Sequence, residues 1–202
     1  MEKNFGRYQL HLCMHGRFDE ALSEVKRASE LDPLSRIINA NLGNVYSFAR
    51  HYDLAIEQLR NTLEMYPDFI PAHYFLGRAY IFKGEIANGV EQLQQAIRLA
   101  NDDPRLLAVL GYAHGISGNR EEAGRTLVRL EELSATRDVS AYDYATVYAG
   151  LGDRKKAVEF LEQCLEQAEW RRLIFLKVDP FWDNLRDDPR FVELLKKVGL
   201  DE

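Results

Sequence analysis

Asn44, Arg78 and Tyr112 lie 34 residues apart in the sequence and offer three different kinds of contact. An asparagine amide both donates and accepts hydrogen bonds, so it can hold the backbone of an extended peptide. An arginine binds carboxylates with its planar guanidinium, and a tyrosine ring fills a side-chain pocket. Because equal spacing gives equivalent places in a repeated unit, we expect these three side chains to form one row and to bind a partner.

A second constellation, His11, Cys13 and His15, has the spacing of a metal site. Two histidines four residues apart can share one face of a helix. A zinc site needs three or four ligands, however, and Cys13 falls on another side of the same helix, so exposed surface histidines explain the pattern better. Carboxylates such as Glu121 and Glu122 are typical of a solvated helix face, and no Ser/His/Asp or Cys/His arrangement stands out. We therefore predict no metal, no cofactor and no enzymatic activity.

The elements that would position these side chains are short amphipathic helices. Residues 35–67 contain two helical patterns that are separated by a tight turn at residues 50–52. In the second pattern, Ala55 and Leu59 are four residues apart and therefore share one face. Pro67 ends this second helix. One such hairpin has too little core to stand alone, which predicts further copies.

The hairpin recurs every 34 residues without an insertion. The small residue of the second helix recurs as Ala21, Ala55, Gly89, Ala123 and Ala157. The turn residue recurs as Gly16, Arg50, Gly84, Gly118 and Gly152, and the small place of the first helix as Gln9, Gly43, Gly77, Gly111 and Ala145. Small residues at Gly77 and Gly111 predict that helices approach each other closely there.

A 34-residue helix-turn-helix unit of this kind resembles the tetratricopeptide repeat. The resemblance implies an all-α fold, a right-handed α-solenoid of five units within residues 2–171. The expected units are 2–35, 36–69, 70–103, 104–137 and 138–171. Residues 172–202 leave the register and are predicted to be a capping tail with a short helix, because the last unit needs its outer face covered. The tail residues expected inside are Phe181, Trp182, Phe191 and Leu195.

Four stretches narrow the resemblance. They are YQLHLCMHGRFDEAL, LDPLSRIINANLG, SAYDYATVYAGLGD and FLKVDPFWDNLRDDPRFVELLKKVGL. Together they resemble the C-terminal tetratricopeptide domain of bacterial multidomain regulators, where it follows winged-helix, kinase or cyclase domains. This resemblance implies a sensory or scaffolding role. The chain itself shows no phosphate loop, no kinase motif and no basic recognition helix.

In this family the first helix of each repeat lines an inner groove that binds peptides. The positions that match by register are Asn41, Asn44, Phe48, Arg78, Phe82 and Tyr112. Tyr74 and Tyr142 flank them, and Arg105 lies near a helix start. Apolar members such as Phe82 could equally pack between helices. The carboxylate clamp of chaperone-binding members is not expected, because only Asn41 fits one placement of its pattern, and only Asn44 and Arg105 fit the other.

Composition narrows the classes of partner. The chain has 26 Lys and Arg against 32 Asp and Glu, a net charge of −6, without a basic run, which argues against nucleic acid and anionic membranes. It shows no apolar run of transmembrane length and no apolar segment of a signal peptide. Cys13 and Cys164 lie in the first and fifth units, which predicts reduced thiols and a cytoplasmic protein. We predict a protein-interaction scaffold that binds an extended peptide. The alternative is homotypic assembly, such as a homodimer, through the first repeat or the aromatic tail.

Overall fold

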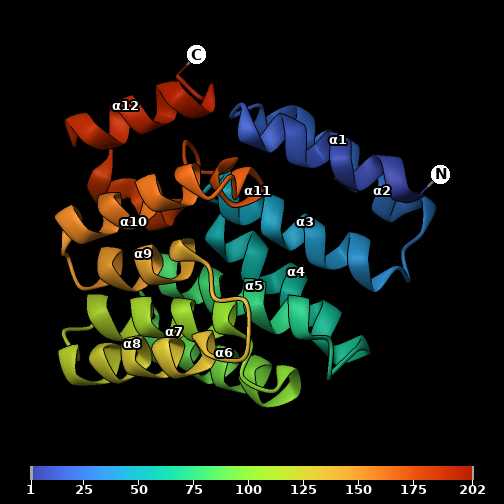
Figure 1. Cartoon of the computed structure of the whole chain (residues 1–202). Coiled ribbons are helices and arrows are strands. Elements are labelled where there is room, and N and C mark those ends of the chain that lie inside the picture. Colours follow the sequence, from blue (N-terminus) through green and yellow to red (C-terminus); the bar gives the residue numbers. More distant parts are fainter. Residues whose placement is uncertain (1, 202) are drawn as a thin grey trace. The chain divides into compact units, whose positions relative to one another are not determined.

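The computed structural model is helical throughout (Figure 1). It describes residues 2–201, and side chains from residue 8 to residue 201. Strands are absent from this described part, so the predicted all-α fold, a solenoid of helical repeats, is confirmed. The chain forms two compact units, Met1–Ala100 and Asn101–Glu202, and each is considered by itself. None of the helices in residues 2–201 combines the length and the apolar character that crossing a bilayer requires.

Unit 1 consists of three helical hairpins. Their helices are α1 (Glu2–Met14), α2 (Phe18–Leu31), α3 (Arg36–Phe48), α4 (Tyr52–Met65), α5 (Ile70–Lys83) and α6 (Ile86–Ala100). The predicted turn residues lie between the paired helices with left-handed backbone, φ 70° at Gly16, 65° at Arg50 and 93° at Gly84. Glycine adopts this conformation without a steric penalty, whereas at Arg50 it costs about 1–2 kcal/mol.

Unit 2 consists of two hairpins and the tail. Its helices are α7 (Pro104–Ile116), α8 (Arg120–Ser134), α9 (Ala141–Gly150), α10 (Arg154–Glu166), α11 (Trp170–Leu173), the 3₁₀ helix η1 (Pro180–Leu185) and α12 (Pro189–Val198). Side chains fix where several of these helices begin. Asp103 accepts a hydrogen bond from the Arg105 amide at the start of α7, and Ser140 and Asp143 form a capping box at the start of α9.

Glycines mark the places where helices touch most closely. A Cβ atom on Gly77 would lie 2.9 Å from Cγ of Leu93 and 3.1 Å from the carbonyl oxygen of Gly89. In unit 2 the contact is between backbones, because a Cβ on Gly150 would lie 2.5 Å from Cα of Tyr112. At Gly111, the other place predicted from the sequence, a Cβ would lie 2.9 Å from Cγ2 of Thr126. The distances at Gly77 and Gly111 confirm that helices approach closely at these two small residues, and a larger side chain there would separate them.

The tail is part of the core of unit 2. Trp182 and Phe191 are 0% exposed and Phe181 is 2% exposed, as the sequence predicted. Leu195 was expected inside as well, but its side chain is only half-buried. Its neighbour Leu194 is the buried leucine of α12, at 1% exposed. Both leucines belong to an apolar stripe, and a turn of 100° per residue separates them.

Replacing Gly150 with alanine should destabilise the fold, because the new methyl group would overlap the backbone of α7. We expect Gly150→Ala to lower the free energy of unfolding by about 1–3 kcal/mol, measured by chemical denaturation. The matched control is Gly124→Ala in α8, where a Cβ meets nothing within 4 Å. That variant should gain about 1 kcal/mol, because alanine favours helix more than glycine does. Equal effects at the two sites would contradict the packing described above.

The two tryptophans provide a matched test of the tail. Trp182→Ala removes a fully buried side chain and should lower the free energy of unfolding by about 3–5 kcal/mol. Trp170 is 48% exposed, and Trp170→Ala should stay within about 0.5 kcal/mol of the wild type. Thermal denaturation of both variants measures this difference. A wild-type melting temperature for Trp182→Ala would show that the tail does not stabilise unit 2.

Candidate functional site

Six of the predicted binding residues come together on unit 1, on one surface of α3 and α5. Asn41, Asn44 and Phe48 are spaced three and four residues apart on α3, and Tyr74, Arg78 and Phe82 are spaced four apart on α5. Residues at this spacing share a helix face. The two helices pack against each other, so the six side chains form one surface, which we call the α3–α5 face.

The centre of the α3–α5 face is an arginine among aromatic rings. The guanidinium carbon of Arg78 lies 5.7 Å from the ring centroid of Phe48, 5.5 Å from that of Tyr74 and 5.6 Å from that of Phe82. A cation this close to a ring is attracted by its quadrupole, by about 0.5–1 kcal/mol at exposed sites and about 2 kcal/mol or more where water is excluded. Arg78 is only 7% exposed, so the second regime applies.

Access to the α3–α5 face is uneven. Asn44 is 8% exposed, and Phe48 is 3% exposed. Asn41, Tyr74 and Phe82 are half-buried and therefore keep part of their surface in solvent. A molecule that approached this face would meet the amide of Asn41 and the two rings before it met the guanidinium.

In unit 2 the tail contacts two of the predicted binding residues. The ring of Phe181 meets that of Tyr112 edge-on, with centroids 4.8 Å apart. The indole N–H of Trp182 donates a hydrogen bond to the Tyr142 hydroxyl, 3.2 Å away, and the two rings pack edge to face. Arg105 is exposed and pairs with Asp103, with Nη2 and Oδ2 2.6 Å apart.

A buried polar cluster anchors the tail to α9, and the sequence did not predict it as a site. Asp143 is 2% exposed, and its carboxylate accepts a hydrogen bond from the Ser140 amide and pairs with Arg172, 3.2 Å away. Burial raises the pKa of Asp143 to about 6, against the opposing effect of Arg172. Glu169 joins the cluster through a hydrogen bond from the Ser140 hydroxyl. The only signal in the sequence was the capping-box pattern at Ser140.

The two cysteines are free and buried, and burial disfavours the thiolate form of both. Burial raises the pKa of Cys13 to about 12 and that of Cys164 to about 12. Exposed His11 and His15 lie together with ring centroids 4.7 Å apart, and Cys13 is buried away from solvent. Among the side chains of residues 8–201, no group of three His, Cys, Asp or Glu could hold a metal ion.

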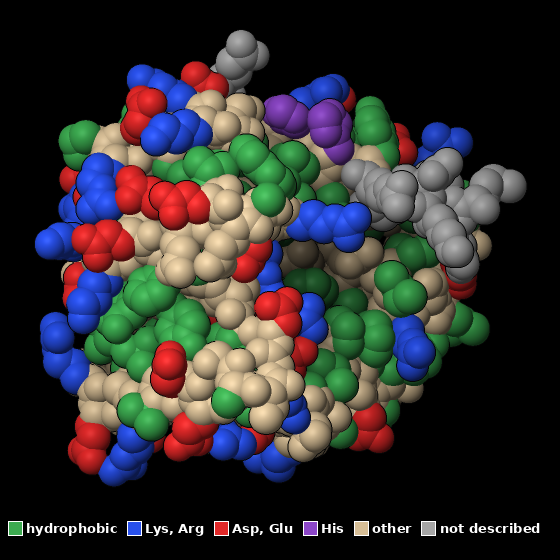
Figure 2. All heavy atoms as spheres, in the orientation of Figure 1, with side chains coloured by type: hydrophobic (Ala, Val, Ile, Leu, Met, Phe, Trp, Pro, Cys, Tyr) green, Lys and Arg blue, Asp and Glu red, His purple; other side chains and the backbone are tan. Residues whose placement is uncertain are grey.

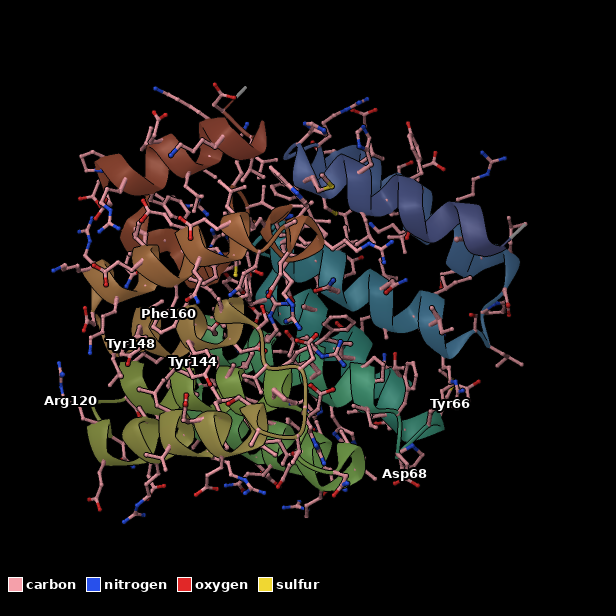
Figure 3. All side chains as sticks on the ribbon, in the orientation of Figure 1. Tyr66, Asp68, Arg120, Tyr144, Tyr148 and Phe160 are labelled. Atoms are coloured by element: carbon pink, nitrogen blue, oxygen red, sulfur yellow. The ribbon has the colours of Figure 1, made fainter. Side chains whose placement is uncertain are left out.

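Unit 2 also carries a cluster of three aromatic rings that the sequence analysis did not predict. Phe160 of α10 stacks on Tyr144 and Tyr148 of α9, with centroids 5.2 and 5.4 Å apart and ring planes within 18° of parallel (Figure 3). All three are half-buried, and Figure 2 shows hydrophobic side chains gathered on the surface of unit 2 beside α8 and α9. The sequence did contain a signal for this cluster, because Phe160 is the one apolar residue at its place in the repeat. The other four repeats have polar residues there: Glu24, Gln58, Gln92 and Thr126.

Comparisons with known proteins agree with this architecture. Models of the tetratricopeptide repeat match residues 49–111 and 140–169. A BBSome complex member from Bos taurus is 22% identical over 174 residues, 86% of this chain and 32% of that protein. A FAM10 family protein from Arabidopsis thaliana is 31% identical over 127 residues, 61% of this chain and 29% of that protein. The chain thus spans about a third of the length of these curated relatives.

Solved structures show the same fold at low sequence identity. A thermophilic TPR protein from Thermus thermophilus has a TM-score of 0.68 and 21% identity, with 92% of this chain and 99% of that chain covered. MamA from Desulfovibrio magneticus, from residue 41 to its end, has a TM-score of 0.58 and 21% identity, with 68% and 78% covered. Residues 49–111 and 140–169 therefore match the tetratricopeptide repeat, and the fold of the chain is that of a tetratricopeptide-repeat solenoid.

Proposed function

We propose that this chain is a protein-interaction module that binds an extended segment of a partner, with the α3–α5 face of unit 1 as its main contact. Tetratricopeptide-repeat proteins generally mediate protein–protein interactions. The observation that carries the proposal is the enclosure of the Arg78 guanidinium by the rings of Phe48, Tyr74 and Phe82.

This arrangement suits a peptide that carries a carboxylate. Rings that enclose the guanidinium hold it in one orientation and exclude water, which strengthens a charge-assisted hydrogen bond to a carboxylate. The half-buried rings of Tyr74 and Phe82 offer apolar surface beside it. Asn41 and Asn44 supply amides for the peptide backbone. The net charge of −6 disfavours a broadly acidic partner, so the carboxylate would be a local anchor.

On unit 2 the proposal includes Arg105, Tyr112 and Tyr142. The tail already lies against Tyr112 and Tyr142 through Phe181 and Trp182. A partner segment there would have to extend this contact or compete with a tethered segment, whose effective concentration is high. We therefore give unit 1 the principal role.

The resemblance to regulators extends the proposal to a cellular role. We propose that the module is the sensory or scaffolding part of a bacterial signalling protein in the cytoplasm, where free thiols such as Cys13 and Cys164 persist. One of the similar proteins, the BBSome complex member, belongs to a multiprotein complex.

The second candidate function is homotypic assembly, favoured by an exposed apolar patch at the α2–α3 connection. Leu31 is 72% exposed, Leu34 69% and Ile37 60%. Three large apolar side chains within seven residues are unusual on the surface of a monomer. The tail is not the contact that this candidate would use, because Phe181, Trp182 and Phe191 are buried.

The α3–α5 proposal is tested by Arg78→Lys, which keeps the charge but removes the planar fork. Partners purified with the wild type should bind the folded variant at least about tenfold more weakly. Arg27→Lys on the exposed surface of α2 is the control and should bind as the wild type does. Circular dichroism verifies folding, and unchanged affinity of a folded Arg78→Lys variant would refute the proposal.

The assembly candidate is tested by Leu34→Asp, which places a charge in the exposed apolar patch. If copies associate through this patch, the variant should shift the sedimentation coefficient from dimer to monomer at equal concentration, because a buried unpaired charge is costly. Leu34 is 69% exposed, so the substitution should leave the melting temperature unchanged. A monomeric wild type would rule the candidate out.

A further inference from the structure

Unit 1 has a crevice between α4 and α6 that is separate from the α3–α5 face. Its volume is about 500 Å³, and its floor is formed by Leu76 and Tyr80 of α5. Tyr80 is two residues from Arg78, and two residues turn a helix by about 200°, so the floor lies on the side of α5 opposite Arg78. A partner in this crevice would therefore leave the α3–α5 face untouched.

One wall of the crevice is held in place by hydrogen bonds. Nε2 of His73 lies 2.7 Å from the carbonyl oxygen of Pro67, and Nδ1 lies 2.8 Å from Oε1 of Gln92. Pro67 lies in the α4–α5 loop, where Figure 3 labels the residues on either side of it, Tyr66 and Asp68. Because Gln92 is bonded to His73, its side chain is held at the wall and leaves the ring of Tyr80 half-buried.

The equivalent place in unit 2 is filled by an aromatic ring. Leu76, Tyr80 and Gln92 correspond, two repeat lengths later, to Tyr144, Tyr148 and Phe160. There Phe160 stacks on both tyrosines, as Figure 3 shows. The geometry of the repeat thus accommodates a six-membered ring against the aromatic residue of the first helix. Offset stacking of this kind adds about 0.5–1.5 kcal/mol beyond the burial of apolar area.

The charges at the rim indicate what should flank that ring. Glu64 and Glu91 are exposed beside the crevice, and neither forms an ion pair with another described side chain. Arg60 is the only cation among the lining residues, so the rim is negative on balance. Basic side chains on a partner would complement it and would speed its association.

We propose that the crevice between α4 and α6 binds a protein segment that presents an aromatic side chain flanked by lysine or arginine. The aromatic ring stacks on Tyr80 in the place that Phe160 takes in unit 2. The basic side chains pair with Glu64 and Glu91. Main-chain polar groups of the segment stay in solvent at the open side of the crevice.

The probe is the peptide acetyl-Gly-Ser-Lys-Phe-Lys-Ser-Gly-amide, titrated into the full chain and followed by NMR. The ring signals of Tyr80 and the side-chain signals of His73 and Gln92 should shift saturably, with a dissociation constant of about 1 mM or lower. The peptides with alanine for phenylalanine, and with glutamate for both lysines, should each bind at least about tenfold more weakly. No saturable shift, or equal shifts with the alanine peptide, would overturn the proposal.

Two variants locate the binding. Gln92→Phe reproduces the residue of unit 2 and should abolish binding by filling the crevice from within. Glu91→Lys lies on the exposed surface and should weaken binding at least about tenfold without unfolding the chain. Glu30→Lys, an exposed charge reversal on α2, is the control and should bind nearly as the wild type does. If Glu91→Lys binds the peptide as the control does, the occupant is not the proposed segment. The same conclusion follows if the wild type sediments as a dimer and Glu91→Lys as a monomer, because the crevice would then bind a second copy of the chain.

Discussion

The close approach of helices at glycines is the constraint on which both units depend. Gly77 in unit 1 has no room for a Cβ beside Leu93, and Gly150 in unit 2 has none beside the backbone of Tyr112. Helices that approach this closely fix the azimuth of every other side chain on them. The same helix can therefore place Arg78 on one surface and Tyr80 on the opposite one, which separates two candidate binding sites by the width of α5.

The register of the repeat made most of the fold predictable. Helix pairs, turn residues and caps follow from local rules: a left-handed backbone at Gly84, or an Asp103 side chain that accepts a hydrogen bond from the Arg105 amide at the start of α7. The tail lies outside that register, and only its apolar content could be used. Phe181, Trp182 and Phe191 are buried as expected, but the stripe on α12 contains adjacent leucines, and the sequence could not decide that Leu194 lies deeper than Leu195.

The candidate site was predictable in position but not in environment. Spacing placed Tyr74, Arg78 and Phe82 on one side of α5, yet it could not show that Phe48 of another helix completes the enclosure of the guanidinium. The contact of Trp182 with Tyr142 joins residues 40 positions apart, outside any period. Contacts of this kind depend on tertiary packing, which overrides the local pattern.

Departures from the repeat pattern indicate where the two units differ in what they can bind. In the last repeat of unit 2, Phe160 replaces the polar residue that the other repeats have and stacks on Tyr144 and Tyr148. The tail packs on Tyr112 and Tyr142 of the same unit. Aromatic surface there is used within the unit and adds stability. In unit 1 the residue at the place of Phe160 is Gln92, and the residue at the place of Tyr112 is Arg78, which packs against aromatic rings. Glu64 and Glu91 border the crevice. Polar and charged groups of this kind contribute specificity more than stability, so recognition of a partner should depend mainly on unit 1.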